Sequence, residues 1–275
     1  MLGPAEEMPD PERRFVIGDG FDFAVGWYRL AYSPRKSRRG SDTDRTAAIR
    51  EVHHQRCIFC VKGKYAIICD RVLGKGRHQI DILFHLAPVV MGEDKGRTAQ
   101  AVELEIMPNG MVVTKESRHT NVAIVPAQDQ SLKVLDLIGR KDPVRGWFAL
   151  YGIQPSHDIV YRCNPELPEH FETVVQPLPA GTSEPLKVQS QQVNSKDGKT
   201  CAAVKCGNDL FLISYDGQAE MTCEGIKFIG TALLLKFDKS GRTARAYMVD
   251  VELLTVGGRE IFSTDTQKLA VSLIK

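Results

Sequence analysis

The fold is decided by the stretch HHQRCIFCVKGKYAIICDRVLGKGRHQIDILFHLAP, residues 53–88. Three short runs rich in Val, Ile, Phe and Tyr follow one another here, separated by Lys-Gly-Lys and Gly-Lys-Gly. Runs of this length, bounded by glycine, are typical of β-strands joined by tight turns. The stretch therefore predicts three consecutive strands of a sheet.

The rest of the chain repeats this pattern, and helical periodicity is nearly absent. AVELEIMPNGMVVTKES (101–117) predicts a hairpin with a Pro-Asn-Gly turn, and the last third reads as a meander with tight turns. The predicted fold class is all-β, a large antiparallel β-sandwich with many strands and meander hairpins.

Composition changes along the chain predict four parts. They are a linker-like N-terminus (1–20), the main sandwich sheets (21–178), a connection rich in Pro, Ser and Gln (179–199), and a meander that packs on the same sandwich (200–275).

The overall composition excludes several classes of partner. The formal net charge is only +2, which gives no argument for nucleic-acid binding, and the basic run at 33–45 is interpreted as a solvated loop. The sequence contains no run of about 18 apolar residues, so it predicts no membrane-spanning helix. The acidic, Pro-rich start does not read as a signal peptide, so we expect either an intracellular protein or an internal fragment of an exported one.

Cys57 and Cys60 form a CxxC pair inside the first predicted strand. Residues three apart in a strand point to opposite faces, so these two cannot coordinate one metal ion together. We interpret them as buried free thiols.

Strand alternation sorts the polar residues of 53–88 into faces. His54 and Arg56 share one face of the first strand, while His53 shares the other face with Gln55. Histidine and aspartate from adjacent strands form a chemically sensible zinc set. The competing interpretation is that the histidines hydrogen-bond neighbours and that Asp70 caps the turn that follows it.

The order of motifs along the chain carries a resemblance. The motifs are FDFAVGWYRLAYS (21–33), the stretch 53–88, GWFALYG (146–152), LPEHFETVVQPLP (167–179) and DLFLISYDG (209–217). From about residue 15 to the C-terminus this series resembles the C-terminal β-sheet part of the heparinase II/III-like polysaccharide lyases.

The resemblance implies a function and partners. Enzymes of this family join an N-terminal α/α toroid to a β-sandwich, and they cleave uronic-acid-containing polysaccharides such as glycosaminoglycans by β-elimination. Family members are typically periplasmic or secreted. We therefore expect an acidic polysaccharide as substrate and a toroid domain or subunit as partner. This chain reads as the sandwich half, lacking the toroid.

The resemblance also suggests site residues. His53 or His54 stands where the family places a histidine near the cleft, and Arg56 lies on the same strand. Trp27 and Tyr28 are the candidate substrate contacts. A structural zinc ion would use His54, Asp70 and His85. Members with a clear zinc site tend to carry His-x-His here, whereas this chain has Arg56 two residues after His54. An ion pair between Arg56 and Asp70 is the metal-free alternative.

Three functions remain open from the sequence. The chain is the accessory half of a lyase, or a carbohydrate-binding or structural β-sandwich without catalysis. The third function is a self-sufficient lyase with Tyr65 or Tyr28 as the base, but half of the usual cleft would then be missing.

Overall fold

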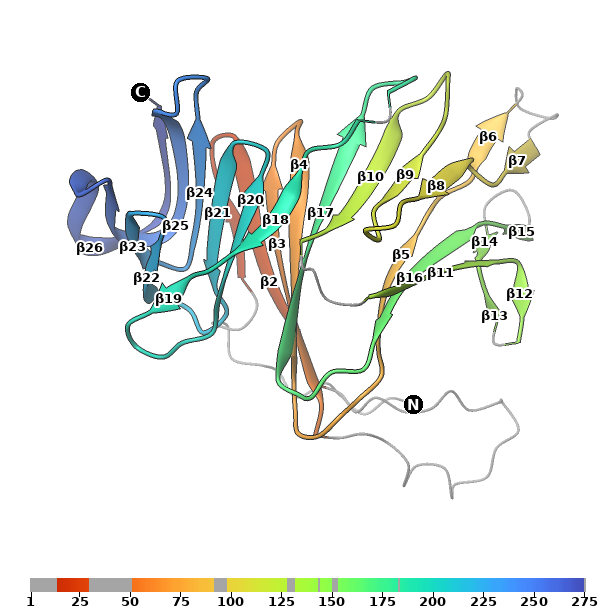
Figure 1. The fold of residues 1–275 in the computed structure, drawn as a ribbon, viewed down its shortest axis with the longest axis horizontal. Coiled ribbons are helices and arrows are strands. Elements are labelled where there is room, and N and C mark those ends of the chain that lie inside the picture. The colour runs from red at the N-terminus through yellow and green to blue at the C-terminus, as the bar shows by residue number, and fades with distance from the viewer. Residues whose placement is uncertain are drawn as a thin grey trace. The chain divides into compact units, whose positions relative to one another are not determined.

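The computed structural model describes residues 14–29, 51–91, 98–127, 132–142, 144–149, 153–182 and 184–274. These residues form strands and no helix, so the predicted all-β class is confirmed (Figure 1). The basic run at 33–45 lies outside the described residues. In the described part of the chain, no helix is long and apolar enough to cross a membrane.

The chain divides into two compact units. Unit 1 combines Met1–Lys75, Leu167–Val174 and Leu186–Lys275, and unit 2 combines Gly76–Glu166 and Val175–Pro185. The strands of unit 1 are β1 (Arg14–Ile17), β2 (Phe21–Tyr28), β3 (His53–Val61), β4 (Tyr65–Leu73), the first part of β17 (Glu169–Leu178), β18 (Val188–Gln191), β19 (Asn194–Ser195), β20 (Cys201–Cys206), β21 (Asp209–Ser214), β22 (Ala219–Cys223), β23 (Ile226–Gly230), β24 (Ala232–Phe237), β25 (Thr243–Val256) and β26 (Arg259–Ile274). The strands that lie wholly in unit 2 are β5 (Ile80–His85), β6 (Val89–Met91), β7 (Thr98–Gln100), β8 (Leu104–Ile106), β9 (Val112–Thr114), β10 (Asn121–Pro126), β11 (Lys133–Ile138), β12 (Arg140–Lys141), β13 (Val144–Arg145), β14 (Trp147–Ala149), β15 (Ile153–Pro155) and β16 (His157–Cys163).

Unit 1 is a sandwich of two sheets. Within unit 1, the first sheet has the order β1-β2-β3-β4-β17, and the second contains β18 to β26 with β20-β21-β24-β25 at its centre. Aromatic rings join the two sheets. The ring of Phe59 lies 5.2 Å from Phe21 in its own sheet and 5.3 Å from Phe211 in the other. The inward side chains of both sheets therefore share one core.

The second sheet of unit 1 is buried on both faces. Phe211 faces the first sheet, whereas Leu210 and Leu212 belong to a separate core cluster with Met221 and Phe228. A strand covered on both sides needs apolar residues at consecutive positions instead of alternate ones. This explains the continuous apolar runs LFLI in β21 and ALLL in β24.

A bend in β25 lets one strand serve both parts of this sheet. β24 pairs with its first half and β23 with its second half, and register shifts follow the bend. Asp250 lies at the bend with φ +54°. Aspartate tolerates this left-handed conformation better than most residues do. Its buried carboxylate forms an ion pair with Arg14 and accepts a hydrogen bond from Thr231 at 2.6 Å.

Unit 2 contains the antiparallel sheet β11-β16-β5 and several short hairpins. The predicted Pro-Asn-Gly hairpin is confirmed, because β8 pairs with β9 around a turn in which Met107 and Met111 are hydrogen-bonded. Gly110 has φ +81° in this turn, a conformation that glycine adopts without steric cost.

Two stretches that composition marks as connections also contain strands. β1 lies within 1–20, and β18 and β19 lie within 179–199. β1 has only four residues, of which Phe15 and Ile17 are exposed, while β18 and β19 consist largely of polar residues, so composition does not reveal these strands.

Candidate functional site

The β3–β4 hairpin positions the central candidate residues. Burial alternates along β3, with Gln55 and Cys57 buried and His54 and Arg56 partly exposed. This confirms the predicted faces. Arg56 is the direct cross-strand partner of Asp70, and His54 lies two residues away on the same face. The pleat of one hairpin therefore brings an imidazole, a guanidinium and a carboxylate together.

The three side chains meet at the carboxylate of Asp70. His54 Nε2 lies 2.6 Å from Oδ1, while Arg56 donates from Nε to Oδ1 at 2.7 Å and from Nη2 to Oδ2 at 2.9 Å. The Asp70 side chain is only 3% exposed. Burial raises the pKa of this carboxyl, but the hydrogen bonds from His54 and Arg56 outweigh it, so the pKa lies below its usual range. Asp70 is therefore ionised at neutral pH.

An ionised Asp70 fixes the chemistry of His54. A neutral imidazole in this position donates its Nε2–H to the carboxylate, which leaves Nδ1 as the basic nitrogen. A carboxylate that orients an imidazole in this way is a common arrangement for a general base. The geometry therefore suits proton transfer at His54 Nδ1.

A cleft of about 420 Å³ opens beside this group. Its lining consists of Ala24, Val25, Gly26, Trp27, Tyr28, His54, Arg56 and Ile58. β2 pairs Tyr28 with His54 and Gly26 with Arg56. A Cβ atom on Gly26 would meet no atom within 4 Å, so the missing side chain leaves open space next to the guanidinium. Four predicted site residues thus line one cleft.

The other aromatic candidate, Trp27, has a different setting from Tyr28. Trp27 pairs with Gln55, which belongs to the inward face of β3, while Tyr28 is 41% exposed on the cleft side. The guanidinium of Arg29 lies 4.9 Å from the centre of the Trp27 ring. Tyr28 is therefore better placed than Trp27 to contact a ligand.

His53 and His54 point to opposite faces of β3. His53 pairs with Leu73, and its Nδ1 is buried without a hydrogen-bond partner among the described residues. The structure thus brings His54, and not His53, together with Arg56 and Asp70.

The residues around Asp70 do not fit a zinc ion as they lie. Zinc needs ligand atoms at about 2.0–2.2 Å with free lone pairs. His54 and Asp70 are hydrogen-bonded to each other, and Arg56 bonds both carboxylate oxygens and places a positive charge there. Among the described residues no group of three or more His, Cys, Asp or Glu could hold a metal ion.

The third predicted zinc ligand, His85, belongs to unit 2. Its ring stacks on Phe148 with 6.0 Å between ring centres, and its Nδ1 lies 3.9 Å from Asp158 Oδ1. The zinc site at His54, Asp70 and His85 stays a prediction, which elemental analysis of the purified protein tests.

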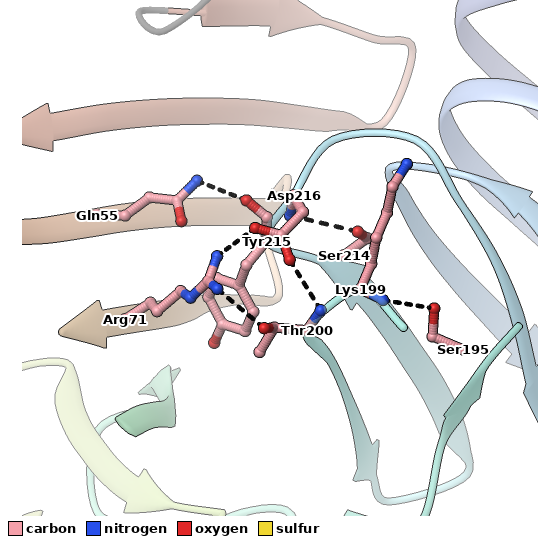
Figure 2. Close-up of polar contacts among 8 residues, drawn as sticks. All are labelled: Gln55, Arg71, Ser195, Lys199, Thr200, Ser214, Tyr215 and Asp216. Carbon is pink, nitrogen blue, oxygen red and sulfur yellow. Dashed lines mark hydrogen bonds and ion pairs between the residues drawn. The ribbon is translucent and has the colours of Figure 1, made fainter. Parts of the chain in front are cut away.

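A second polar cluster lies on the inward face of the same hairpin (Figure 2). Arg71 donates to Asp216 at 2.5 Å and to Thr200 Oγ1 at 2.9 Å, and Gln55 Nε2 donates to the carbonyl of Tyr215 at 3.0 Å. Burial raises the pKa of Asp216, but the bond from Arg71 outweighs this and holds the pKa below its usual value. These contacts tie the first sheet to the 215–216 turn of the second.

Glu172 extends this cluster into β17. The hydroxyl of Tyr215 donates to Glu172 Oε1, and His170 Nδ1 lies 2.9 Å from the same oxygen. Burial lowers the pKa of His170, but Glu172 raises it by more, so the pKa lies above its usual value. The sequence assigns His170 no role, because the Tyr215 hydroxyl that shares Glu172 with it comes from a distant part of the chain and no local pattern marks the group.

Comparison with known proteins agrees with the order of motifs. Residues 36–162 match the family model described as "Heparinase II/III-like, C-terminal". These residues are therefore similar to the C-terminal part of the heparinase II/III-like proteins. The match includes β3 and β4, and with them His54, Arg56 and Asp70.

The solved structures that resemble this chain include a heparan sulfate lyase and a heparinase. A heparan sulfate lyase HepC mutant from Pedobacter heparinus is 11% identical, with a TM-score of 0.49 over 74% of this chain and 27% of that protein. A heparinase III structure is 14% identical, with a TM-score of 0.44 over 81% of this chain and 27% of that one. The chain thus spans about a quarter of the length of each of these two proteins. No curated protein matches it.

Proposed function

We propose that this chain is the β-sandwich part of a heparinase II/III-like polysaccharide lyase, and that it acts on uronic-acid-containing polysaccharides together with an α/α toroid. The observation that carries the proposal is the cleft in which His54, held by ionised Asp70, lies beside the Arg56 cation and Tyr28. These groups match the needs of β-elimination next to a carboxylate.

β-Elimination on a uronate needs three actions. A cation or a hydrogen-bond donor neutralises the uronate carboxylate, a base removes the C5 proton, and an acid protonates the leaving 4-oxygen. In the proposal Arg56 binds the carboxylate, in the open space left by Gly26, and His54 Nδ1 accepts or shares the C5 proton. The toroid supplies the remaining acid and most of the groove.

Tyr65 does not suit the role of base. It is buried, its hydroxyl donates to Asp209 at 2.6 Å, and burial raises its pKa above the usual range. Tyr28 is exposed at the end of β2, where it is the cross-strand partner of His54. A self-sufficient lyase is therefore the weaker alternative.

The test separates binding from cleavage. The isolated chain is titrated with heparan sulfate, hyaluronan and alginate oligosaccharides, with a neutral glucan as control, and the unsaturated uronate product is followed by ultraviolet absorbance. We expect salt-sensitive binding of the acidic ligands, weakened by His54→Gln, and no cleavage. Cleavage should begin only when a toroid part is supplied, and His54→Gln should abolish it.

Two outcomes would contradict the proposal. Equal affinity for the neutral glucan would remove the acidic polysaccharide as ligand. Full cleavage by the His54→Gln variant in the reconstituted enzyme would leave a non-catalytic carbohydrate-binding sandwich as the better account.

A further inference from the structure

Asp70 is a buried carboxylate that needs a positive partner. The residue is 2% exposed and lies on β4 with its side chain toward His54 and Arg56. A buried ionised carboxylate without a partner is strongly destabilising, so a cation or several donors must neutralise it. Imidazole and carboxylate ligands on neighbouring strands are one solution, in which a divalent metal supplies the charge.

The guanidinium of Arg56 solves the same problem without a metal. Its planar fork donates to both oxygens of Asp70, at 2.7 and 2.9 Å. His54 Nε2 adds a third bond, to Oδ1. Bidentate arginine–carboxylate pairs combine charge with fixed geometry, which lysine cannot reproduce.

We propose that the Arg56 guanidinium takes the place of a metal ion at Asp70, and that it keeps divalent cations out of this hairpin. Folding of the β3–β4 face is then independent of metal. The inference does not rest on the proposed function, since it concerns the charge at Asp70 whether or not a polysaccharide binds.

The experiment replaces Arg56 in the full chain and measures zinc and thermal stability together. Arg56→His places a second imidazole two residues after His54 and directly opposite Asp70, which completes a His-His-Asp set. We expect the Tm of this variant to rise with added Zn²⁺ and to fall again with EDTA. Neither Zn²⁺ nor EDTA should change the Tm of the wild type, and its zinc content should be far below one ion per chain.

A matched control exists in unit 2. Arg162 and Asp81 are also direct cross-strand partners, joined by two bonds of 2.7 Å, but the Asp81 side chain is 21% exposed and Val160 stands two residues before Arg162. Arg162→His therefore lacks the second imidazole, and its Tm should not respond to Zn²⁺.

Alanine variants keep the test decisive if histidine at position 56 perturbs folding. Arg56→Ala should lower the Tm by roughly 5 °C or more, and Arg162→Ala by less, because Asp70 is the more buried partner. Asp70→Asn in the Arg56→Ala background should recover part of the loss by removing the uncompensated charge. A wild type that purifies with one zinc per chain and loses Tm in EDTA would overturn the proposal, and so would an Arg56→His variant that ignores Zn²⁺.

Discussion

At the residue scale, His170 and Glu172 couple stability to pH. Burial lowers the pKa of His170, but Glu172 raises it by more, so that the pKa lies above its ordinary 6.5. Glu169 adds to the rise and Arg71 opposes it. A raised pKa means that protonated His170 stabilises the folded state fully below about pH 6.5 and that this contribution disappears as pH rises through the folded-state pKa. The free-energy difference between wild type and His170→Gln in urea unfolding should therefore be larger at about pH 6 than at about pH 9. A difference that grows with pH would contradict the ion pair.

Tyr215 supplies a second residue-scale prediction. Removing its hydroxyl leaves buried Glu172 with one donor fewer, which should cost about 1–3 kcal/mol in the free energy of unfolding. Tyr247→Phe is the control: among the described residues this hydroxyl accepts a long bond of 3.3 Å from Arg245, so its removal should cost less than about 1 kcal/mol in the free energy of unfolding. Chemical denaturation of the two variants measures both values, and equal losses would remove Glu172 as the reason.

The candidate site was predictable only where a single hairpin builds it. Alternation along β3 places His54 and Arg56 on one face, and the short turn makes Asp70 their neighbour, so the metal-free ion pair could be anticipated from spacing. The inward cluster could not be anticipated. Glu172 and Tyr215 are 43 residues apart and come from different sheets, and no local pattern connects them.

At the element scale, the bend of β25 depends on Asp250. Its left-handed backbone is tolerated by aspartate and asparagine, and its carboxylate bonds Arg14 and Thr231. Asp250→Ala loses the contacts and keeps the strain, so it should cost about 3–5 kcal/mol, whereas Asp250→Asn should cost less because it keeps the backbone tolerance and a bond to Thr231. Guanidinium unfolding of both variants provides the measurement. An alanine variant as stable as the asparagine variant would show that the bend is set elsewhere.

Elements were predictable to the extent that their cause is local. Turn chemistry predicts the β8–β9 hairpin, and apolar runs predict β21 and β24. The register shifts in β25 and the left-handed conformation of Asp250 are not revealed by any periodicity of the sequence. β1 was hidden for a similar reason, because Phe15 and Ile17 point outward from a four-residue strand.

At the scale of the whole molecule, the seven cysteines report on the integrity of the fold. None forms a disulfide, and four are buried, namely Cys57, Cys69, Cys206 and Cys223. This confirms the prediction for Cys57, while Cys60 is only partly buried.

Burial raises the pKa of Cys57 and Cys206 to about 12. At neutral pH, Ellman's reagent should therefore find at most Cys60, Cys163 and Cys201 in the native protein, and all seven thiols after denaturation. Seven rapidly reacting thiols in the native state would contradict the buried cores.

The contact between β1 and β26 has a consequence for synthesis of the chain. Ser272 donates to the carbonyl of Asp19 at 2.8 Å, and Asp250 pairs with Arg14, so β1 and the residue before β2 meet strands that are made much later. A ribosome releases the aromatic face of Phe21 and Phe59 long before Phe211 and Tyr247 emerge to cover it. The largely continuous segment Gly76–Glu166, by contrast, leaves the exit tunnel as one piece. The apolar face of the nascent first sheet therefore stays uncovered until β21 and β25 have been made, and exposed apolar faces of this kind are prone to aggregate during folding.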